Sequence, residues 1–277
     1  MKQRLRLFLF ICLAAAFPGT AGAFVPQTPH LLHLVISKIK QPVGVEARQT
    51  TTLLDCDTCD EQQADIREIL IYDFPGRFRS DILSDSATSF KIESALGFIK
   101  ISNGATVSTQ KSFLDFYTDI LLYRDHEALT HQLQLAGIDT QRVSLRRDKE
   151  TICYVIGQPG EAGTPFAGLW IEKDTLLPFK YVVTVGDTLV ECRYAQWMKI
   201  SKTWYPMQVS ILLDDQVFAA VDVSDVELKT GFAPALFDIS DIKRLYPRKL
   251  PADVPEATSE GVDELEERIE TFRKLYD

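Results

Sequence analysis

Positive charge, histidine and methionine are scarce in this chain of 277 residues. It has 30 Lys or Arg residues against 39 Asp or Glu residues, a formal net charge of −9, four histidines and three methionines. No patch of Lys and Arg interleaved with aromatic residues occurs along it. Nucleic acid and anionic lipid headgroups are therefore poor partners on this charge balance, because both attract clustered positive charge.

Catalytic signatures are also missing. The sequence contains no Gly-x-Ser-x-Gly elbow and no glycine-rich phosphate loop. The stretch His126-Glu-Ala-Leu-Thr-His131 looks like a zinc-protease helix, but its histidines are five residues apart. Five residues turn an α-helix by about 500°, which leaves the two side chains roughly 140° apart. We therefore expect no metal site, no cofactor and no enzymatic activity.

Long apolar runs are absent after the N-terminus. Residues 7–17 form an apolar stretch that follows Lys2, Arg4 and Arg6 and precedes the sequence Ala21-Gly-Ala23. This order of charged, apolar and small residues is typical of a cleavable secretory signal peptide. We assign residues 1–23 to the signal and expect an exported mature chain, in which no further run approaches the roughly 18 residues of a transmembrane helix.

Cysteine is rare, and four of the five cysteines lie beyond the signal. Cys56 and Cys59 stand in an acidic turn, where we favour a local disulfide because export leads to an oxidising compartment. A redox pair and a zinc pair are weaker alternatives. Neighbouring carboxylates would raise the thiol pKa, and no second pair follows at zinc-ribbon spacing. Cys153 and Cys192 lie in predicted strands and are expected to be buried free thiols.

Alternation of apolar and polar residues runs through most of the mature chain. This period of two, broken by turn signals such as Asn103-Gly104, predicts about eleven antiparallel strands. Helices are predicted over residues 28–40 and within an insertion at about 112–135, where Ser112 and Asp115 form a capping pattern. Because so long a sheet must curl, the expected fold class is α+β: a strongly curved antiparallel half-barrel with helices covering the concave face.

The composition changes after residue 242. Prolines recur at 247, 251 and 255, and the last 19 residues are acidic with one apolar stripe at helical spacing. We therefore assign residues 24–242 to the half-barrel domain, 243–258 to a proline-rich linker and 259–277 to an acidic amphipathic helix.

Large apolar side chains in the strands and in the insertion are candidates to line a vacant cavity for acyl chains. Each methylene of a buried guest contributes about 0.8 kcal/mol. Ile99 and Ile101 alternate with Phe98 and Lys100, and we place the two isoleucines on the inner face. The candidate lining comprises Phe78, Ile99, Ile101, Phe116, Ile120, Trp170, Tyr181, Trp197, Trp204 and Tyr205.

Several stretches resemble the LolA/LolB-type family of periplasmic lipoprotein carriers. They are Tyr72-Asp-Phe-Pro-Gly-Arg-Phe-Arg-Ser80, Leu169-Trp-Ile-Glu-Lys-Asp-Thr-Leu-Leu-Pro178 and Trp204-Tyr-Pro-Met207, followed by Val226-Glu-Leu228 and Leu236-Phe-Asp238. The family carries an arginine before the early proline, where this chain has Phe74, and Arg79 in the following strand is closer to the pattern of distant relatives.

The resemblance implies a curved half-barrel with a helical lid and no cofactor. It also implies a periplasmic carrier that takes the acyl chains of lipoproteins or other lipids to the outer membrane, with donor and acceptor proteins at the membranes as partners. The alternative on the same fold is an RseB-like periplasmic sensor that binds lipid or misfolded protein and contacts a membrane partner, for which the C-terminal helix is the motivation.

Overall fold

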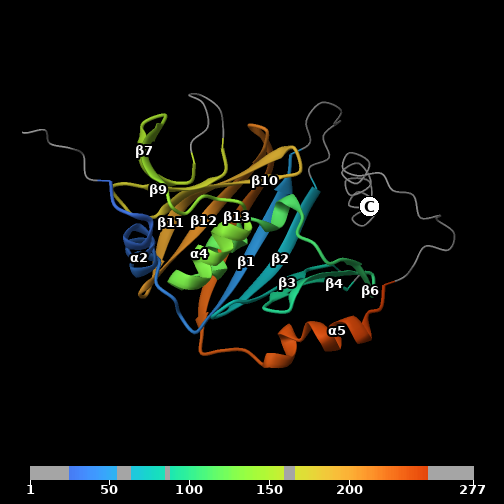
Figure 1. The fold of residues 1–277 in the computed structure, drawn as a ribbon. Coiled ribbons are helices and arrows are strands. Elements are labelled where there is room, and N and C mark those ends of the chain that lie inside the picture. The colour runs from blue at the N-terminus through green and yellow to red at the C-terminus, as the bar shows by residue number, and fades with distance from the viewer. Residues whose placement is uncertain (1–24, 55–63, 85–87, 159–165, 249–277) are drawn as a thin grey trace, which may run out of the picture.

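The structure is a computed structural model that describes residues 25–54, 64–84, 88–158 and 166–248 (Figure 1). The signal peptide, Cys56, Cys59 and the C-terminal helix at 259–277 lie outside the described residues, and so do most of the residues assigned to the linker. Within the described ranges, no helix has the length and apolarity needed to cross a bilayer.

Thirteen antiparallel strands form one open sheet in the order β6-β5-β4-β3-β2-β1-β13-β12-β11-β10-β9-β8-β7. The N-terminal half consists of β1 (Gly44–Leu53), β2 (Ala64–Asp73), β3 (Arg77–Ile82), β4 (Ser89–Ser94), β5 (Gly97–Ser102) and β6 (Ala105–Ser108). The C-terminal half consists of β7 (Val143–Asp148), β8 (Thr151–Ile156), β9 (Gly168–Glu172), β10 (Pro178–Val185), β11 (Thr188–Ile200), β12 (Thr203–Leu213) and β13 (Gln216–Lys229).

The two halves are meanders that join where β1 pairs with β13, for example at Val45 opposite Leu228. The antiparallel arrangement and the hairpin at Asn103-Gly104 are confirmed, and the sheet has thirteen strands where about eleven were predicted. A strand that the sequence did not reveal is β7. It is an edge strand with three exposed residues in a row, so it lacks the alternation that marks a half-buried strand.

The connection from β6 to β7 must run from one edge strand of the sheet to the other. This crossing segment, residues 109–142, contains η1 (Phe113–Asp115), α3 (Thr118–Leu122) and α4 (His126–Leu135). Its residues Leu121, Leu129 and Leu133 are buried in the larger of two apolar clusters, together with side chains from both halves of the sheet. We call the face of the sheet that carries this cluster the inner face.

The N-terminal helix α2 (Thr28–Ile39) also packs on the inner face, beside α4 (Figure 1). Its buried residues Leu31, Leu32, Val35 and Ile39 form the stripe that the sequence predicted. The sheet curves around these two helices in Figure 1. The capping box at Ser112 and Asp115 is confirmed as well, because the Asp115 carboxylate accepts hydrogen bonds from the backbone amide and the hydroxyl of Ser112 over 2.8 and 2.6 Å.

A second, smaller apolar cluster lies on the opposite, outer face of the N-terminal half. Here η2 (Pro234–Phe237) and α5 (Ile239–Leu245) contribute Phe237, Ile239 and Ile242. Figure 1 shows α5 beside β4 and β6, and the Thr106 hydroxyl donates to the Tyr246 carbonyl over 2.5 Å. The packed chain therefore continues past residue 242, where the sequence suggested a linker. We call residues 232–246 the outer strap.

Candidate functional site

The inner face of the C-terminal half is an apolar floor that the protein's own helices cover. Its side chains are at most 2% exposed, and Leu129 and Leu133 of α4 pack in the same cluster without any exposed surface. We define the inner floor as Tyr181, Val183, Val190, Val209, Ile211 and Val221. The floor is filled in this arrangement, so the vacant trough that the sequence suggested is not confirmed.

Tyrosine hydroxyls at the edge of the floor all have polar partners, as burial requires. The Tyr205 hydroxyl donates to that of Tyr72 over 3.3 Å, and the Tyr194 hydroxyl donates to the Tyr117 carbonyl over 2.8 Å. Burial raises the pKa of Tyr205 to about 12. These groups are therefore neutral hydrogen-bonding partners, and the Tyr194 bond ties the crossing segment directly to β11.

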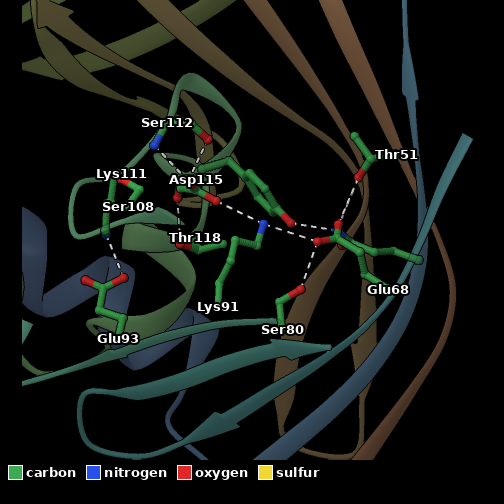
Figure 2. Close-up of polar contacts among 12 residues, drawn as sticks. Thr51, Glu68, Ser80, Lys91, Glu93, Ser108, Lys111, Ser112, Asp115 and Thr118 are labelled. Carbon is green, nitrogen blue, oxygen red and sulfur yellow. Dashed lines mark hydrogen bonds and ion pairs between the residues drawn. The ribbon is translucent and has the colours of Figure 1, made fainter. Parts of the chain in front are cut away.

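On the inner face of the N-terminal half, buried ion pairs lie beside the apolar side chains of the inner cluster (Figure 2). The Lys91 ammonium on β4 lies 2.9 Å from the Asp115 carboxylate of the crossing segment and 3.1 Å from the Glu68 carboxylate of β2. Burial alone would lower the pKa of Lys91, but the two carboxylates raise it well above its ordinary value. Lys91 is therefore a buried cation that bridges the sheet and the crossing segment.

Glu68 is held by three hydrogen-bond donors besides the Lys91 ion pair. Gln49 and Thr51 donate to one of its oxygens over 2.9 and 3.1 Å, and Ser80 donates to the other over 2.8 Å. Burial would raise the pKa of Glu68, but Lys91 and these hydrogen bonds outweigh it and hold the pKa below its ordinary value. The carboxylate is therefore ionised and fixed in place.

A second ion cluster lies beside the first. The Lys111 ammonium pairs with Glu93 of β4 over 2.7 Å and also with Asp119 of α3. The other oxygen of Glu93 accepts from the Tyr123 hydroxyl over 2.8 Å, and the Gln132 amide of α4 donates to Asp119 over 2.9 Å. Burial raises the pKa of Glu93. Lys111 thus links strand β4 to α3, and α3 holds α4.

Arg124 forms a third polar node where the crossing segment meets α2. Its guanidinium donates to the Lys40 carbonyl over 3.0 Å and to the Thr203 hydroxyl over 2.7 Å, and that hydroxyl itself lies 2.8 Å from the Ile39 carbonyl. Burial lowers the pKa of Arg124 to about 10, so it stays cationic at neutral pH. The node satisfies the carbonyl groups that the end of α2 leaves open.

Two small hollows lie in the described part of the protein. The first, of about 20 Å³, lies in the first ion cluster and is lined by Thr51, Ile66, Glu68, Ile82, Lys91, Lys100, Ser112 and Leu114. It has room for about one water molecule. The second, of about 150 Å³, is lined by Val182, Leu189, Glu191, Asp214 and Asp215. Both are smaller than the roughly 300 Å³ at which ligand pockets begin.

Seven of the ten residues predicted to line a cavity lie in or against the inner cluster. Phe78, Ile120, Tyr181 and Tyr205 are buried in it, and Phe116, Trp197 and Trp204 pack against it while partly exposed. Trp197 donates to the Pro178 carbonyl over 3.1 Å, and Lys38 of α2 lies 5.2 Å from the Trp204 ring. Whether any of the seven contacts a guest remains a proposal.

The inner placement of three other residues is wrong. Ile99 and Ile101 lie in the outer cluster under α5, because their neighbour Lys100 faces the inner ion cluster. Trp170 alternates with Leu169 and Ile171 of the inner cluster and faces outward, with Lys180 4.2 Å from its ring. Alternation separated the two faces of each strand but could not say which face was inner.

Arg79, singled out by its resemblance to distant relatives, lies on the outer face. Its guanidinium forms an ion pair with Asp81, donates to the Leu236 carbonyl over 3.2 Å and lies 4.3 Å from the Phe90 ring. It therefore anchors the outer strap. Cys153 and Cys192 are buried free thiols as predicted, and burial raises the pKa of Cys153 to about 12, so both are poor nucleophiles.

The ion clusters were not predicted from the sequence. Their one visible signal was the capping pattern at Ser112 and Asp115, which indicated a helix start and not a buried ion pair. In the described part of the chain no group of three or more His, Cys, Asp or Glu residues is placed to hold a metal ion. The site therefore combines a covered apolar floor with buried charged side chains beside it.

Two solved structures resemble this fold. A LolA superfamily protein from Nitrosomonas europaea gives a TM-score of 0.53 at 12% identity, over 76% of this chain and 97% of that one. A domain described as an outer membrane lipoprotein-sorting protein, from Vibrio parahaemolyticus, gives 0.51 at 11% identity, over 78% and 98%. No family model and no curated protein matches the sequence. The chain has a LolA-like fold.

Proposed function

We propose that this protein is a periplasmic carrier that binds the acyl chains of lipoproteins or other lipids on its inner floor and delivers them to the outer membrane. The observation that carries the proposal is an apolar floor covered by a separate crossing segment, on a LolA-like fold. Such a cover can move away without breaking the sheet, because none of its residues belongs to a strand. Binding of this kind needs no catalytic group.

A guest must displace the crossing segment, since the floor is already filled. The apolar contacts that it replaces include those of Leu129 and Leu133 of α4, each of which has no exposed surface. Truncating a buried leucine typically costs about 2–5 kcal/mol, so the two together correspond to about 4–10 kcal/mol. One long acyl chain gains on the order of 10 kcal/mol before its entropy costs. The two free energies are of similar size, so the guest and α4 compete for one surface.

This competition predicts a direction for the Leu133→Ala variant. Loss of the leucine weakens the attachment of α4, so the variant should bind a fluorescent fatty-acyl probe about tenfold more tightly than the wild type. Fluorescence titration of the delipidated protein measures the affinity, and native mass spectrometry of the undelipidated protein detects lipid that co-purifies.

Ile242→Ala is the matched control, because it removes a buried aliphatic side chain from the outer cluster. It should lower the free energy of unfolding to a similar extent and leave probe affinity unchanged. Absence of probe uptake by wild type and Leu133→Ala alike, with no co-purified lipid, would remove the carrier proposal.

A further inference from the structure

The charges of the first ion cluster come from two separate parts of the chain. Lys91, Lys100 and Glu68 belong to strands β4, β5 and β2, whereas Asp115 belongs to the crossing segment. Lys91 lies 2.9 Å from Asp115 and 3.1 Å from Glu68. When the crossing segment moves away, the first cluster retains Lys91 and Lys100 against the single carboxylate of Glu68 and becomes locally positive. Glu93 of the neighbouring cluster loses Lys111 at the same time and stays on β4 as a carboxylate.

The Asp115 carboxylate therefore occupies the position in which an anionic group of a ligand would contact Lys91. It accepts the Lys91 ammonium on one oxygen, and its other oxygen accepts the backbone amide and hydroxyl of Ser112. The adjoining hollow of about 20 Å³, lined also by Thr51 and Lys100, is too small for a headgroup while this carboxylate is present. An anion can reach Lys91 only in the arrangement that uncovers the inner floor.

The ion cluster and the floor are contiguous. Gln49 donates both to Glu68, over 2.9 Å, and to the Tyr117 hydroxyl, over 2.7 Å. The Tyr117 carbonyl in turn accepts the hydroxyl of Tyr194, which is buried in the apolar cluster. A guest with an acyl chain on the floor would thus place a polar end beside Lys91.

We propose that Lys91, with Lys100 beside it, binds the anionic group of an acyl-bearing guest, a phosphate or a carboxylate, in the position that Asp115 occupies in the covered state. This inference rests on the proposed function and names its guest as an anionic amphiphile. The acidic balance of the whole chain argues against binding to an anionic surface, but it does not govern a buried site. There the nearest charges decide, and charge-assisted hydrogen bonds are the strongest.

The test compares two fluorescent lipids with identical acyl chains, phosphatidylglycerol and phosphatidylcholine, on the delipidated full mature chain. Wild type should bind the anionic lipid about tenfold more tightly. Lys91→Gln should abolish that preference by weakening only the anionic lipid. Lys173→Gln, at an exposed turn position, is the matched control and should keep the preference.

Lys91→Gln leaves two buried carboxylates without their cation, so a folding control is required. The triple variant Glu68→Gln, Lys91→Gln and Asp115→Asn removes the two carboxylates together with Lys91, so no carboxylate of this cluster is left without its cation. Loss of the preference in it supports the proposal just as well. A preference that persists in either folded variant overturns the proposal.

The outcomes separate the two levels of inference. Equal affinity of wild type for the two lipids overturns the anionic site and leaves the carrier standing, whereas no binding of either lipid removes the carrier itself. Inorganic phosphate is the third arm. Phosphate binding that is sensitive to Lys91→Gln, combined with equal lipid affinities, would replace the amphiphile by a free anion and overturn the proposal.

Discussion

The two segments that cover the N-terminal half of the sheet are attached by different physics. The outer strap buries Phe237, Ile239 and Ile242 in an apolar cluster. The crossing segment is attached to the opposite face of the same strands through two ion pairs, Asp115 with Lys91 and Lys111 with Glu93. Apolar burial stabilises in proportion to its area, whereas a buried ion pair gains little beyond the cost of its desolvation. Over the N-terminal half, the outer strap is therefore held mainly by apolar burial and the crossing segment mainly by buried charges.

The largest expected effect comes from breaking the attachment of the crossing segment at Lys111. Lys111→Met leaves Glu93 and Asp119 as buried carboxylates without a cation. Removing one partner of a buried ion pair typically costs about 3–5 kcal/mol. Urea unfolding at pH 7 should show a loss of that size.

Lys173→Met, at an exposed position, is the control for loss of one lysine and should change the free energy of unfolding by less than about 0.5 kcal/mol. If Lys111→Met were as mild as this control, the second ion cluster would not fix the crossing segment, and the contrast between the two covers would fail.

The second expected effect depends on pH. Burial would raise the pKa of Asp115, but Lys91 and the Ser112 hydrogen bonds hold it below the ordinary value of 3.8. A carboxyl with a depressed pKa in the folded state stabilises fully above its unfolded pKa, and that stability is lost as the pH falls through the folded value. Asp115→Asn should therefore cost about 1.5–3 kcal/mol at pH 7, and the difference from wild type should shrink below pH 3.8.

Urea unfolding of both proteins from pH 7 down to pH 3 measures this difference. The same titration of Asp241→Asn, on the exposed surface of α5, should give a small difference that hardly changes with pH. A constant difference for Asp115→Asn down to pH 3 would mean that the ionised carboxylate does not stabilise the cover.

Local patterns predicted the parts of this fold that depend on neighbours in the sequence. The stripe of α2, the capping box at Ser112 and the turn at Asn103-Gly104 were all readable, because each involves residues within a few positions. The antiparallel pairing of consecutive strands followed from short turns between them, but the pairing of β1 with β13 did not. Each of these patterns determines only a local conformation of the chain.

The side-chain contacts between distant segments could not be predicted, because they depend on which face of the sheet the crossing segment and the outer strap each pack on. Ile99 and Ile101 alternate correctly, yet they face the outer strap, whose residues follow some 130 positions later. Lys91 finds Glu68 and Asp115 from two other elements, and no spacing rule links such residues. A sheet with both faces covered has two apolar sides, so alternation alone does not identify the inner one.

The smallest expected effect comes from removing the N-terminal capping residue of a helix in the crossing segment or in the outer strap. Asp125 caps α4 by accepting from the amides of Glu127 and Ala128 over 3.0 and 3.1 Å. Asp238 caps α5 in the same way at the same two distances. Replacing either by Ala should cost about 1 kcal/mol in urea unfolding. Only Asp125→Ala should also tighten binding of the acyl probe, a few-fold, because only α4 competes with the guest. An equal change in probe affinity for both variants would show that the outer strap also opens. The proposal that the probe binds only on the inner face would then be wrong.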